Sequence, residues 1–596
     1  MNGSLVSLNG LLTGNQVFDI PVYQRGYAWE RKNLEDLWED LYYLDPSKKH
    51  YFGTVLLKDS GKTARTSLAV LKRFDLIDGQ QRLTTVLILL REIISQLKEV
   101  SANELRGDVD ELERSYLKNG GHYKLNPLGD DGDFFHRFVI DGNDFLIGNT
   151  TTHSQRRLTE ARAFFRERLI DEKEQQPSKY QKFLVQFKQK IDDLQLIQYL
   201  VNSDADAIRI FETVNDRGRP LSNLEKTKSF LMHTSYLGIE DDDAVAGRLK
   251  ELNGHFSGIF RHFEDVSGTK HMERLRLDED DVHRYHYINY ISPGKTSSRP
   301  TDSLKDRIRD KLRKDPEECV EYAITYAKDL EKSFLAVKQI TEAYRDDKEG
   351  GMLSKIFMLE RMGNIFPLLI ASWLRFRDDG QRLEGILKLL ETFIVRVYLV
   401  SGYRSHTGTS TFNGIAHGVH RKKLDYDSLL DKLRSMNRYY QSNDQFTRAL
   451  GQDDLYERLS SRTIRYLLSE YEIHLRTKID VPLAVATQER ILSSEYEVEH
   501  IWAQHPSYEM SAEEESEHQR NVHRLGNLTI ASQSWNRSMG NKTFQEKRRQ
   551  PGGKPSYSNS NLLVQKGLAK LPSWDVEAIN DREADLVSFA LQRWSV

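Results

Sequence analysis

Cysteine is almost absent from this sequence, because its 596 residues include only one, Cys319. A single thiol excludes both a disulfide framework and a cysteine-rich zinc site within one chain. Long apolar runs are also lacking, since no stretch approaches the roughly 18 consecutive apolar residues of a membrane-spanning helix. The N-terminus has neither the charged start nor the apolar run of a secretory signal. We therefore expect a cytoplasmic protein without a membrane partner.

An excess of one charge sign is missing as well, since 86 Lys and Arg stand against 89 Asp and Glu, a formal net charge of −3. This balance excludes a uniformly basic coat but leaves room for a local basic patch that binds nucleic acid. Residues 520–549 form such a patch, with Glu546 as their one acidic side chain. The same segregation is also typical of an ordinary solvated helix face.

The chain is longer than one compact core usually allows, so we expect several domains. Hydrophobic residues make up 38% of it, enough for buried cores, and the segment patterns predict an α+β multidomain protein. We assign residues 1–235 to a mixed α/β domain, 236–480 to a largely helical domain and 481–596 to a third domain. The helical assignment rests on apolar residues at three- and four-residue steps, as in residues 383–398.

A strand, a tight turn and a helix follow one another in the N-terminal region. Residues 51–57 and 74–78 are rich in aromatic and β-branched side chains, which indicates short strands. Gly79 follows the second strand, and apolar residues then recur at helical spacing from Leu83 to Leu97. This order presents free backbone N–H groups to an anion. A solvated turn whose polar side chains only cap the helix would have the same pattern.

A second ordered junction lies at residues 207–232, where an apolar segment ends at Asn215 and Arg217. Pro220 prevents a helix there, and a capping box at residues 222–225 opens the next one. Arginine can bind two phosphate oxygens at once. Arg25 and Arg82 of the N-terminal region are therefore candidate phosphate-binding residues.

Three segments near the C-terminus together indicate a site that cleaves phosphodiesters. Residues 496–501 form a strand-like run that contains Glu499 and His500, residues 525–530 resemble a hairpin arm, and Asn536 precedes a basic helix. Hydrolysis of a phosphodiester needs an activated water and a cation that neutralises the developing charge. A histidine can take the proton from water, while carboxylate and amide oxygens can hold a hard cation.

Glu499 and His500 are sequence neighbours, and neighbours on a regular strand point to opposite faces. Both can reach one phosphate only if the strand is distorted, so we predict a bend or bulge at residues 499–501. The alternative is that His500 is a packed strand histidine without a catalytic role. The ordered presence of Asn527, Asn536 and the basic helix favours the nuclease site.

These residues resemble the HNH, or ββα-metal, nuclease family. The resemblance implies that Glu499 binds a metal ion, Mg²⁺ or Mn²⁺, and that His500 is the general base. It further implies that Asn527 braces the loop carrying the histidine and that Asn536 completes the metal site. The sequence departs from the related subfamily at Ala503, where proline is usual, which leaves the rigidity of that loop open.

The residues after Asn536 extend this resemblance to the subfamily found at the end of modification-dependent restriction enzymes. Three further histidines lie nearby as candidate phosphate contacts, and the sequence does not choose among them: His505, His518 and His523. The basic side chains that we expect at the DNA are Arg524, Arg537, Lys542, Lys547 and Arg548.

The N-terminal motifs resemble the GmrS half of GmrSD restriction systems, which has a ParB/sulfiredoxin-like fold. The resemblance rests on residues 20–25 with Trp29, on the DGQQR motif of residues 78–82, and on residues 211–218 with Lys228. It implies binding and hydrolysis of a nucleoside triphosphate (GTP, UTP, CTP or ATP) without a P-loop, because no Walker A sequence is present. The residues expected at the nucleotide are Gln24, Arg25, Asp78, Gly79, Gln80, Gln81, Arg82, Thr84, Asn215 and Arg217.

The two resemblances together predict a nucleotide-regulated, modification-dependent (type IV-like) DNA endonuclease for defence against phage. Its partners would be modified phage DNA and a nucleoside triphosphate. One HNH site cuts one strand per event, so a duplex break needs a homodimer or two visits. The alternatives are a phosphorothioate-sensing nicking nuclease, a DNA-binding adaptor with an inactive HNH site, and a nuclease whose Asp78 region binds DNA instead of nucleotide.

Overall fold

The computed structural model describes residues 3–21, 24, 26–45, 50–66, 69–100, 106–127, 131–144, 150, 152–201, 222–238, 242–294, 299–347 and 350–596. The chain divides into two compact units. The first consists of Met1–Glu264 and Leu304–Lys328, and the second of Asp265–Ser303 and Asp329–Val596.

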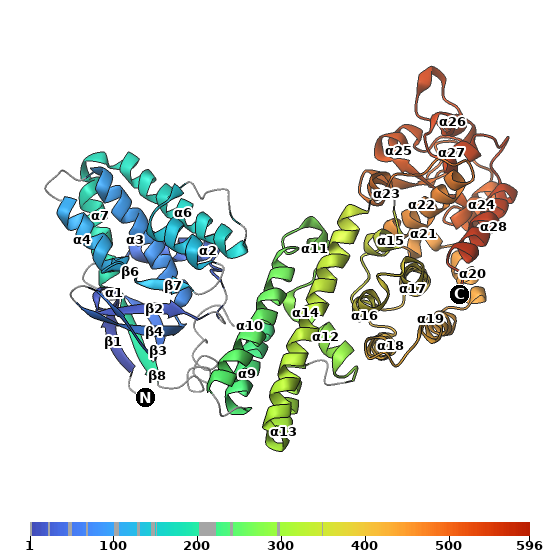
Figure 1. The fold of residues 1–596 in the computed structure, drawn as a ribbon. Coiled ribbons are helices and arrows are strands. Elements are labelled where there is room, and N and C mark those ends of the chain that lie inside the picture. Colours follow the sequence, from blue (N-terminus) through green and yellow to red (C-terminus); the bar gives the residue numbers. More distant parts are fainter. Residues whose placement is uncertain are drawn as a thin grey trace. The chain divides into compact units, whose positions relative to one another are not determined.

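The first unit is built on a six-stranded mixed sheet (Figure 1). Its strands are β1 (Gly3–Ser7), β2 (Gln16–Ile20), β3 (Tyr51–Arg65), β4 (Val70–Asp78), β7 (Leu125–Pro127) and β8 (Gln195–Val201). They lie in the order β1-β8-β3-β4-β2-β7. β2 is parallel to both of its neighbours, whereas β3 is antiparallel to β4 and parallel to β8. The carboxyl ends of β2 and β4 therefore meet at the same edge of the sheet.

Helix α3 (Gln80–Val100) is the central helix of the first unit, and it follows β4 after a single residue, Gly79. Leu83, Val86, Leu87 and Leu90 are at most 1% exposed, as expected for a helix that is apolar on nearly every side. Further helices lie over the same side of the sheet in Figure 1. They include α2 (Arg31–Tyr42), α4 (Arg106–Tyr116), α6 (His153–Gln175) and α7 (Tyr180–Asp192).

Shorter elements and a second group of helices complete this unit. The short elements are α1 (Leu8–Thr13), β5 (Lys118–Asn119), β6 (His122–Tyr123), α5 (Gly132–Phe134), η2 (Phe135–Ile140) and η4 (Pro177–Lys179). The later helices are α9 (Asn223–Gly238), α10 (Asp242–Glu264), α13 (Pro300–Lys314) and α14 (Pro316–Asp346). Of α13 and α14, only the residues Leu304–Lys328 belong to the first unit.

The second unit begins with a helical body. Its members before the C-terminal region are α11 (Lys270–Leu275), α12 (Glu279–Tyr290), α15 (Met352–Met358), α16 (Phe366–Phe376), α17 (Gly380–Phe393), η7 (Ile394–Val400), α18 (Thr409–His420), α19 (Tyr426–Tyr440), α20 (Asn443–Leu450), α21 (Leu455–Arg458), α22 (Ser461–Thr477) and α23 (Val485–Leu492). Phe393, Val397 and Val400 of the α17–η7 segment are at most 1% exposed and lie in its core.

The C-terminal region contains a two-stranded antiparallel sheet, β9 (Tyr496–His500) with β10 (Leu528–Ser532). Helix α25 (Gln533–Met539) begins directly after β10. Ile501, Ala531, Met539, Phe544 and Tyr557 form a small apolar core there. The remaining elements are α24 (Ala512–Asn521), η8 (Leu525–Asn527), α26 (Phe544–Arg548), η9 (Pro551–Gly553), η10 (Tyr557–Asn559), α27 (Leu563–Leu568) and α28 (Val576–Arg593).

The predicted α+β class is confirmed by the mixed sheet and the many helices. Residues 525–527 differ from the predicted hairpin arm, because they form a 3-10 turn and the strand starts only at Leu528. None of the described helices has the length and apolar character needed to cross a bilayer. The domain limits at residues 235 and 480, and the ParB-like and ββα-metal folds, stay predictions.

Candidate functional site

Strand β9 carries the predicted Glu499–His500 pair in regular antiparallel register with β10. Glu499 lies opposite Thr529 and His500 opposite Leu528, without a register shift between them. Because side chains alternate along a strand, Glu497 and Glu499 share one face and Val498 and His500 the other. The chain bends only from Ile501 onward. The predicted distortion therefore begins after the pair and leaves the two side chains on opposite faces.

Asn527 holds the segment that follows His500. Its Oδ1 accepts hydrogen bonds from the Trp502 backbone N–H at 2.7 Å and from Trp574 Nε1 at 3.0 Å. Its Nδ2 donates to the carbonyls of Trp502 at 3.0 Å and Val522 at 2.9 Å. Asn527 is fully buried, so these four bonds use both ends of the amide inside the protein. The backbone two residues after His500 is thereby fixed.

The His500 imidazole is buried between aromatic rings. It is 6% exposed, and its ring lies 4.4 Å from the Tyr456 ring and 5.5 Å from the His523 ring, centroid to centroid. Its Nε2 has no hydrogen-bond partner among the described residues. Burial lowers the pKa of His500 to about 3, and the interactions with His523 and Lys547 act in the same direction. The ring is therefore neutral at pH 7, and its surroundings disfavour protonation unless a nearby negative charge offsets them.

Glu499 points into a closed polar contact instead of toward solvent. Its Oε1 accepts a hydrogen bond from Lys547 Nζ at 2.7 Å and another from the Tyr557 hydroxyl at 3.3 Å. Lys547 Nζ also donates to the His500 carbonyl at 2.7 Å. Burial raises the pKa of Glu499, although the Lys547 ammonium and the Tyr557 hydroxyl act in the opposite direction. An internal ammonium thus provides the positive charge beside this carboxylate.

Asn536 lies on α25, as the family resemblance implies, but it contacts a different glutamate. Its Nδ2 donates to Glu497 Oε2 at 2.7 Å. Among the described residues, no hydrogen bond joins Asn536 to the side chain of His500 or Glu499. The predicted convergence of residues 499, 500 and 536 on one cation is therefore not present in these contacts.

A divalent cation held by Glu499 and Asn536 does not fit this arrangement. The Glu499 oxygen is bonded to an ammonium and a hydroxyl, and the Asn536 amide presents its donor end to Glu497. Within the described part of the chain, His, Cys, Asp and Glu side chains form no group of three suited to a metal ion. The positions of Glu497 and Tyr557 are findings of the structure, and the only sequence signal for Glu497 was its two-residue spacing from Glu499.

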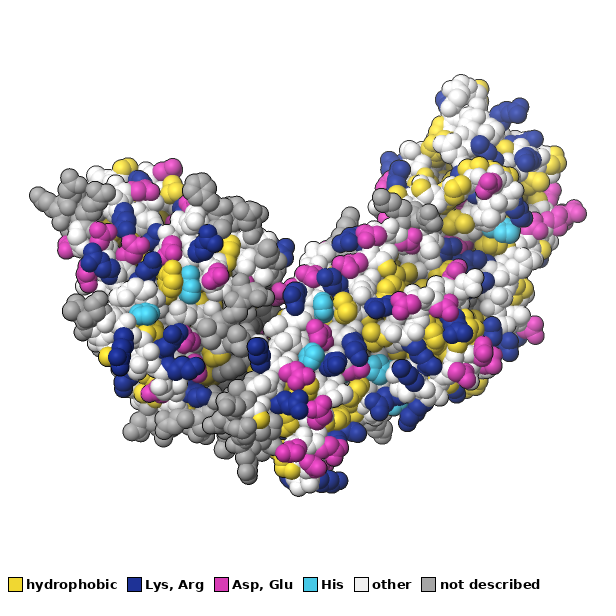
Figure 2. All heavy atoms as spheres, viewed as in Figure 1, with side chains coloured by type: hydrophobic (Ala, Val, Ile, Leu, Met, Phe, Trp, Pro, Cys, Tyr) yellow, Lys and Arg dark blue, Asp and Glu magenta, His cyan; other side chains and the backbone are white. Residues whose placement is uncertain are grey.

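The basic side chains assigned to DNA differ in their surroundings. The assignment of Lys547 is wrong for this arrangement, because its side chain is fully buried and ion-paired with Glu499. Arg524 is half-buried and paired with Glu583, and Arg548 donates to the Ala569 carbonyl. Lys542 bonds to Ser538 and Gln550, whereas Arg537 is exposed. Figure 2 shows Lys and Arg atoms at the end of the chain where α25 and α26 lie in Figure 1.

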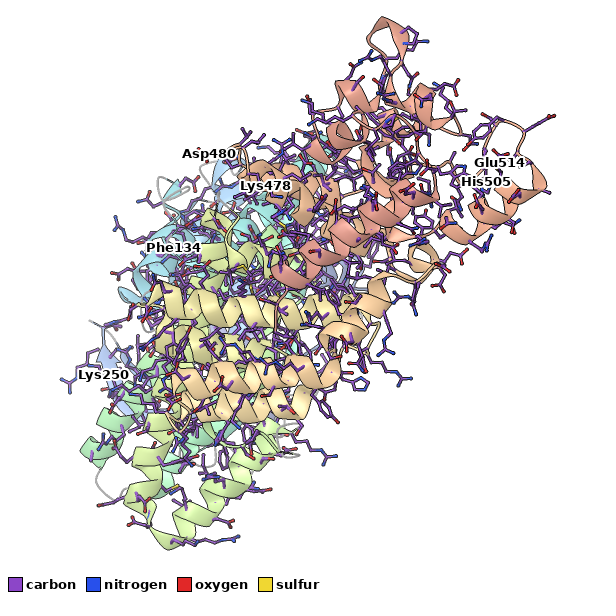
Figure 3. All side chains as sticks on the ribbon, turned by 90° about the vertical axis from the view of Figure 1, so that its right-hand side faces the viewer. Phe134, Lys250, Lys478, Asp480, His505 and Glu514 are labelled. Carbon is purple, nitrogen blue, oxygen red and sulfur yellow. The ribbon has the colours of Figure 1, made fainter. Side chains whose placement is uncertain are left out.

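The three neighbouring histidines also differ in their surroundings. His518 Nε2 bonds to the Ala503 carbonyl at 2.8 Å and so supports the loop in which proline is usual. His523 stacks on Tyr456 and lies edge-on to His500. His505 is exposed, and Figure 3 places it with Glu514 at the outer edge of the C-terminal ribbon. Of the three, His523 is the one in ring contact with His500.

The N-terminal motif lies at the edge where the parallel strands β2 and β4 end. Asp78 is the last residue of β4, and Gly79 adopts a φ of +94° before α3 begins. A Cβ at Gly79 would lie 3.1 Å from a Val55 methyl and 3.2 Å from the Thr54 carbonyl oxygen. Ligands of α/β sheets bind outside the carboxyl ends of such strands.

Side chains of the DGQQR motif tie the loop after β2 to this edge. Gln81 Oε1 accepts from the Ala28 N–H at 2.8 Å, and its Nε2 donates to the Gly26 carbonyl at 3.0 Å. Gln24 Nε2 donates to the Ile77 carbonyl at 2.8 Å. Arg82 lies 3.3 Å from Asp78, with its guanidinium over Gly53. The motif thus joins the loop after β2 to the turn after β4, the two segments predicted to form the nucleotide site.

Other residues assigned to the nucleotide are less accessible. Gln80 and Thr84 are 7% and 4% exposed, so their side chains lie within the unit. Arg25, Asn215 and Arg217 lie outside the described residues. Lys228 is buried near the rings of Phe256 and Phe260, and burial lowers its pKa to about 7.

Both candidate regions match known families. Residues 8–232 match the family described as GmrSD restriction endonuclease, N-terminal domain. Residues 440–589 match GmrSD restriction endonucleases, C-terminal domain. No curated protein matches the chain. The two matched regions together span more than half of the sequence, so the chain belongs to the GmrSD restriction endonuclease family.

Proposed function

We propose that this chain is a nucleotide-regulated DNA endonuclease that cleaves modified phage DNA at an HNH-type site around His500. One observation carries the proposal: a neutral, buried imidazole with an unpartnered nitrogen stands directly before a backbone segment locked by Asn527. The family membership supports the restriction role, and the order of β9, β10 and α25 is the strand–strand–helix order that an HNH site requires.

His500 would act as the base in this proposal. Its neutral ring can take a proton from the attacking water at Nε2, the nitrogen without a partner among the described residues. A bound phosphate would raise the pKa of His500, because a nearby negative charge favours the imidazolium. Asn527 would keep the following loop from moving as the proton is transferred. Mg²⁺ or Mn²⁺, the cofactor expected of the family, would stabilise negative charge on the phosphate when bound.

The edge formed by β2, β4 and α3 is our candidate for the nucleoside triphosphate. The N-terminus of α3 directs backbone N–H groups toward that edge, a geometry that favours phosphate. Arg82 and Asp78 stand beside it, and Gln81 links it to the β2 loop. Nucleotide bound there would license cleavage, which protects host DNA from an unregulated nuclease.

The deciding experiment is a cleavage panel on unmodified DNA and on DNA with different base or phosphorothioate modifications. Each DNA is incubated with the full chain and Mg²⁺, with and without each triphosphate. We expect cleavage of at least one modified DNA, dependent on a triphosphate and absent in His500→Ala. Cleavage that persists in His500→Ala, or no cleavage of any DNA under any condition, would contradict the proposal.

A further inference from the structure

A short acidic segment of the helical body lies against the proposed base. Residues 452–458, which we call the covering segment, contain Asp453, Asp454 and Glu457 and one basic residue, Arg458. Resting on the proposed function, we propose that the covering segment is autoinhibitory. It closes the nuclease site until DNA phosphates displace its carboxylates.

The ring of Tyr456, in the middle of the covering segment, contacts both imidazoles of the site. Its centroid lies 4.4 Å from that of His500, with 71° between the planes, and 5.5 Å from that of His523, with 10° between the planes. The Tyr456 backbone N–H also donates to the His523 carbonyl at 3.0 Å. His500 Nε2 is buried, so a DNA phosphate can approach it only after a neighbouring side chain moves. Tyr456 is such a neighbour and is itself partly open to solvent.

Two carboxylates of the covering segment lie beside the groups that we expect at substrate phosphates. Asp453 Oδ1 lies 3.7 Å from Arg524 Nε, and Glu457 Oε1 lies 3.6 Å from His523 Nε2. Arg524 is one of the side chains assigned to DNA, and His523 is in ring contact with His500. Arginine and histidine bind carboxylate and phosphate alike, so the covering segment places its own negative charge where that of DNA is expected.

The charged contacts of the covering segment suit a reversible closure. The Asp453 and Glu457 side chains are 73% and 66% exposed, and ion pairs of such exposed groups contribute little to stability. Arg524 also pairs with Glu583 at 2.6 Å, so displacement of Asp453 leaves the guanidinium with a charged partner. While the site is closed, the exposed carboxylates repel DNA.

The covering segment is anchored in the helical body. Leu455 is fully buried, and Arg458 donates to the carbonyl of Val400 at 2.6 Å and to that of Ala449. Because the backbone is held at these points, opening requires the Tyr456 ring and the two carboxylates to turn away and leaves the helical body intact. DNA binding can therefore open the site without unfolding α21.

Neutralising the two carboxylates tests the closure with little risk to folding, because both side chains are largely exposed. Asp453→Asn combined with Glu457→Gln is compared with the parent on the modified DNA that the parent cleaves. We expect cleavage without triphosphate to rise by about tenfold or more, a size typical of regulatory coupling. Asp378→Asn combined with Asp431→Asn is the matched control, since these exposed acids also pair with surface arginines, and it should cleave like the parent. Equal triphosphate-free cleavage by the neutralised variant and the parent overturns the inference.

A chemical probe tests the closure over His500 without relying on cleavage. Diethyl pyrocarbonate modifies accessible histidines, and mass spectrometry compares the modification of His500 with that of the exposed His505. We expect His500 to be protected in the parent and in Tyr456→Phe, which keeps the ring, and to lose most of this protection in Tyr456→Ala. Continued protection of the buried His518 shows that Tyr456→Ala has not simply unfolded. Unchanged protection of His500 in Tyr456→Ala overturns the inference.

The outcomes separate the closure from the proposed function. If the closure is overturned but His500→Ala still abolishes cleavage, the nuclease function stands. If the parent cleaves no DNA under any condition, the proposed function fails, and the protection of His500 in Tyr456→Ala still decides whether Tyr456 covers the imidazole.

Discussion

Asn527 and Asn536 are chemically identical residues that the fold uses in different ways. Asn527 is buried and makes four hydrogen bonds, so any change to its amide leaves buried partners without a bond. Asn536 is half-buried and makes a single side-chain bond to Glu497, so its amide can still turn. The first therefore fixes the loop after His500, while the second links α25 to Glu497 of β9.

Replacing Asn527 with aspartate tests that rigidity. The new oxygen would leave the carbonyls of Trp502 and Val522 without a donor, and we expect a loss of at least about 2 kcal/mol in the free energy of unfolding. Chemical denaturation measures it. Asn580→Asp is the matched control, because Asn580 is exposed and its Oδ1 only accepts from Arg524. Equal stabilities of the two variants would show that Asn527 is not a brace.

Replacing His500 with alanine separates catalysis from folding. His500 Nε2 has no hydrogen-bond partner among the described residues, so the variant loses ring packing against Tyr456 and His523 but no bond at this nitrogen, and we expect it to stay folded. Loss of a general base commonly costs about 10²- to 10⁴-fold in rate, and we expect cleavage to fall by that order. Rates are compared at matched DNA affinity, with Tyr456→Phe as the control for the ring contact. A His500→Ala enzyme with parental turnover would exclude His500 as the base.

At the scale of elements, helix α26 shows that a basic helix need not be a DNA-binding helix. Lys547 lies on the face directed to β9. Arg548 is half-buried, and Arg549, directly after the helix, is exposed. Helix α25, directly before it, presents Arg537 to solvent. The exposed part of the basic segment is thus smaller than its composition indicates.

Arg537→Ala should weaken DNA binding similarly for every sequence, because an exposed arginine is expected at the phosphates. The slope of log affinity against log salt should fall by about 1. Arg313→Ala, on the exposed side of α13, serves as the control and should leave the slope unchanged. An unchanged slope in Arg537→Ala would remove this residue from the DNA-binding surface.

Alanine substitutions at two glycines, Gly79 and Gly61, test the role of the turn between β4 and α3. Gly79 and Gly61 both have positive φ, but only at Gly79 would a Cβ meet neighbouring atoms, the nearest at 3.1 Å. We expect Gly79→Ala to lose about 1–3 kcal/mol of stability and to weaken triphosphate binding. Gly61→Ala should show the smaller stability loss and parental binding. If both variants bind nucleotide like the parent, the nucleotide is not bound at this turn.

At the scale of the whole molecule, the two matched families fall in different compact units. Residues 8–232 lie in the first unit and residues 440–589 in the second. The candidate nucleotide edge and the candidate nuclease strand therefore belong to different compact units. In the proposed function, nucleotide bound in the first unit would change the activity of the second.

Acid should destabilise the second unit because it buries neutral histidines. Burial lowers the pKa of His283 to about 4 and that of His286 to about 3, although Asp329 partly opposes the shift at His286. The unfolded chain takes up protons below its own pKa of about 6.5, and the folded chain does not until pH 3–4. The free energy of unfolding should therefore fall from about pH 6.5 downward, by up to about 1.4 kcal/mol per pH unit for each histidine.

The measurement is denaturant unfolding of the second unit between pH 4 and 7, compared with His283→Gln. The variant should show a shallower pH dependence, while the exposed-site control His505→Gln should keep the parental one. Identical dependence in all three proteins would show that His283 is not the group that titrates.

The Asp78–Gly79–Gln80 segment shows which structural features the local sequence pattern predicts correctly. The apolar residues before it and the helical spacing after it predicted a strand, a turn and a helix, and β4, Gly79 and α3 have those positions. The same holds for β9, whereas the pattern placed Asn536 before a helix and the structure places it inside α25. These features depend on neighbours within a few residues, so the order of side chains along the chain is sufficient to specify them.

Lys547 shows a feature that the local sequence pattern does not predict. Its charge and its basic neighbours indicate an exposed residue, but the tertiary structure buries it against Glu499, a partner 48 residues away along the chain. The sequence alone determined the residue types available for cleavage and their order on strands and helices. Only the tertiary structure decided that Glu499 pairs with Lys547 and Glu497 with Asn536, because these contacts depend on packing between segments distant in sequence. A charge can be buried without a large energetic cost only when a partner accompanies it.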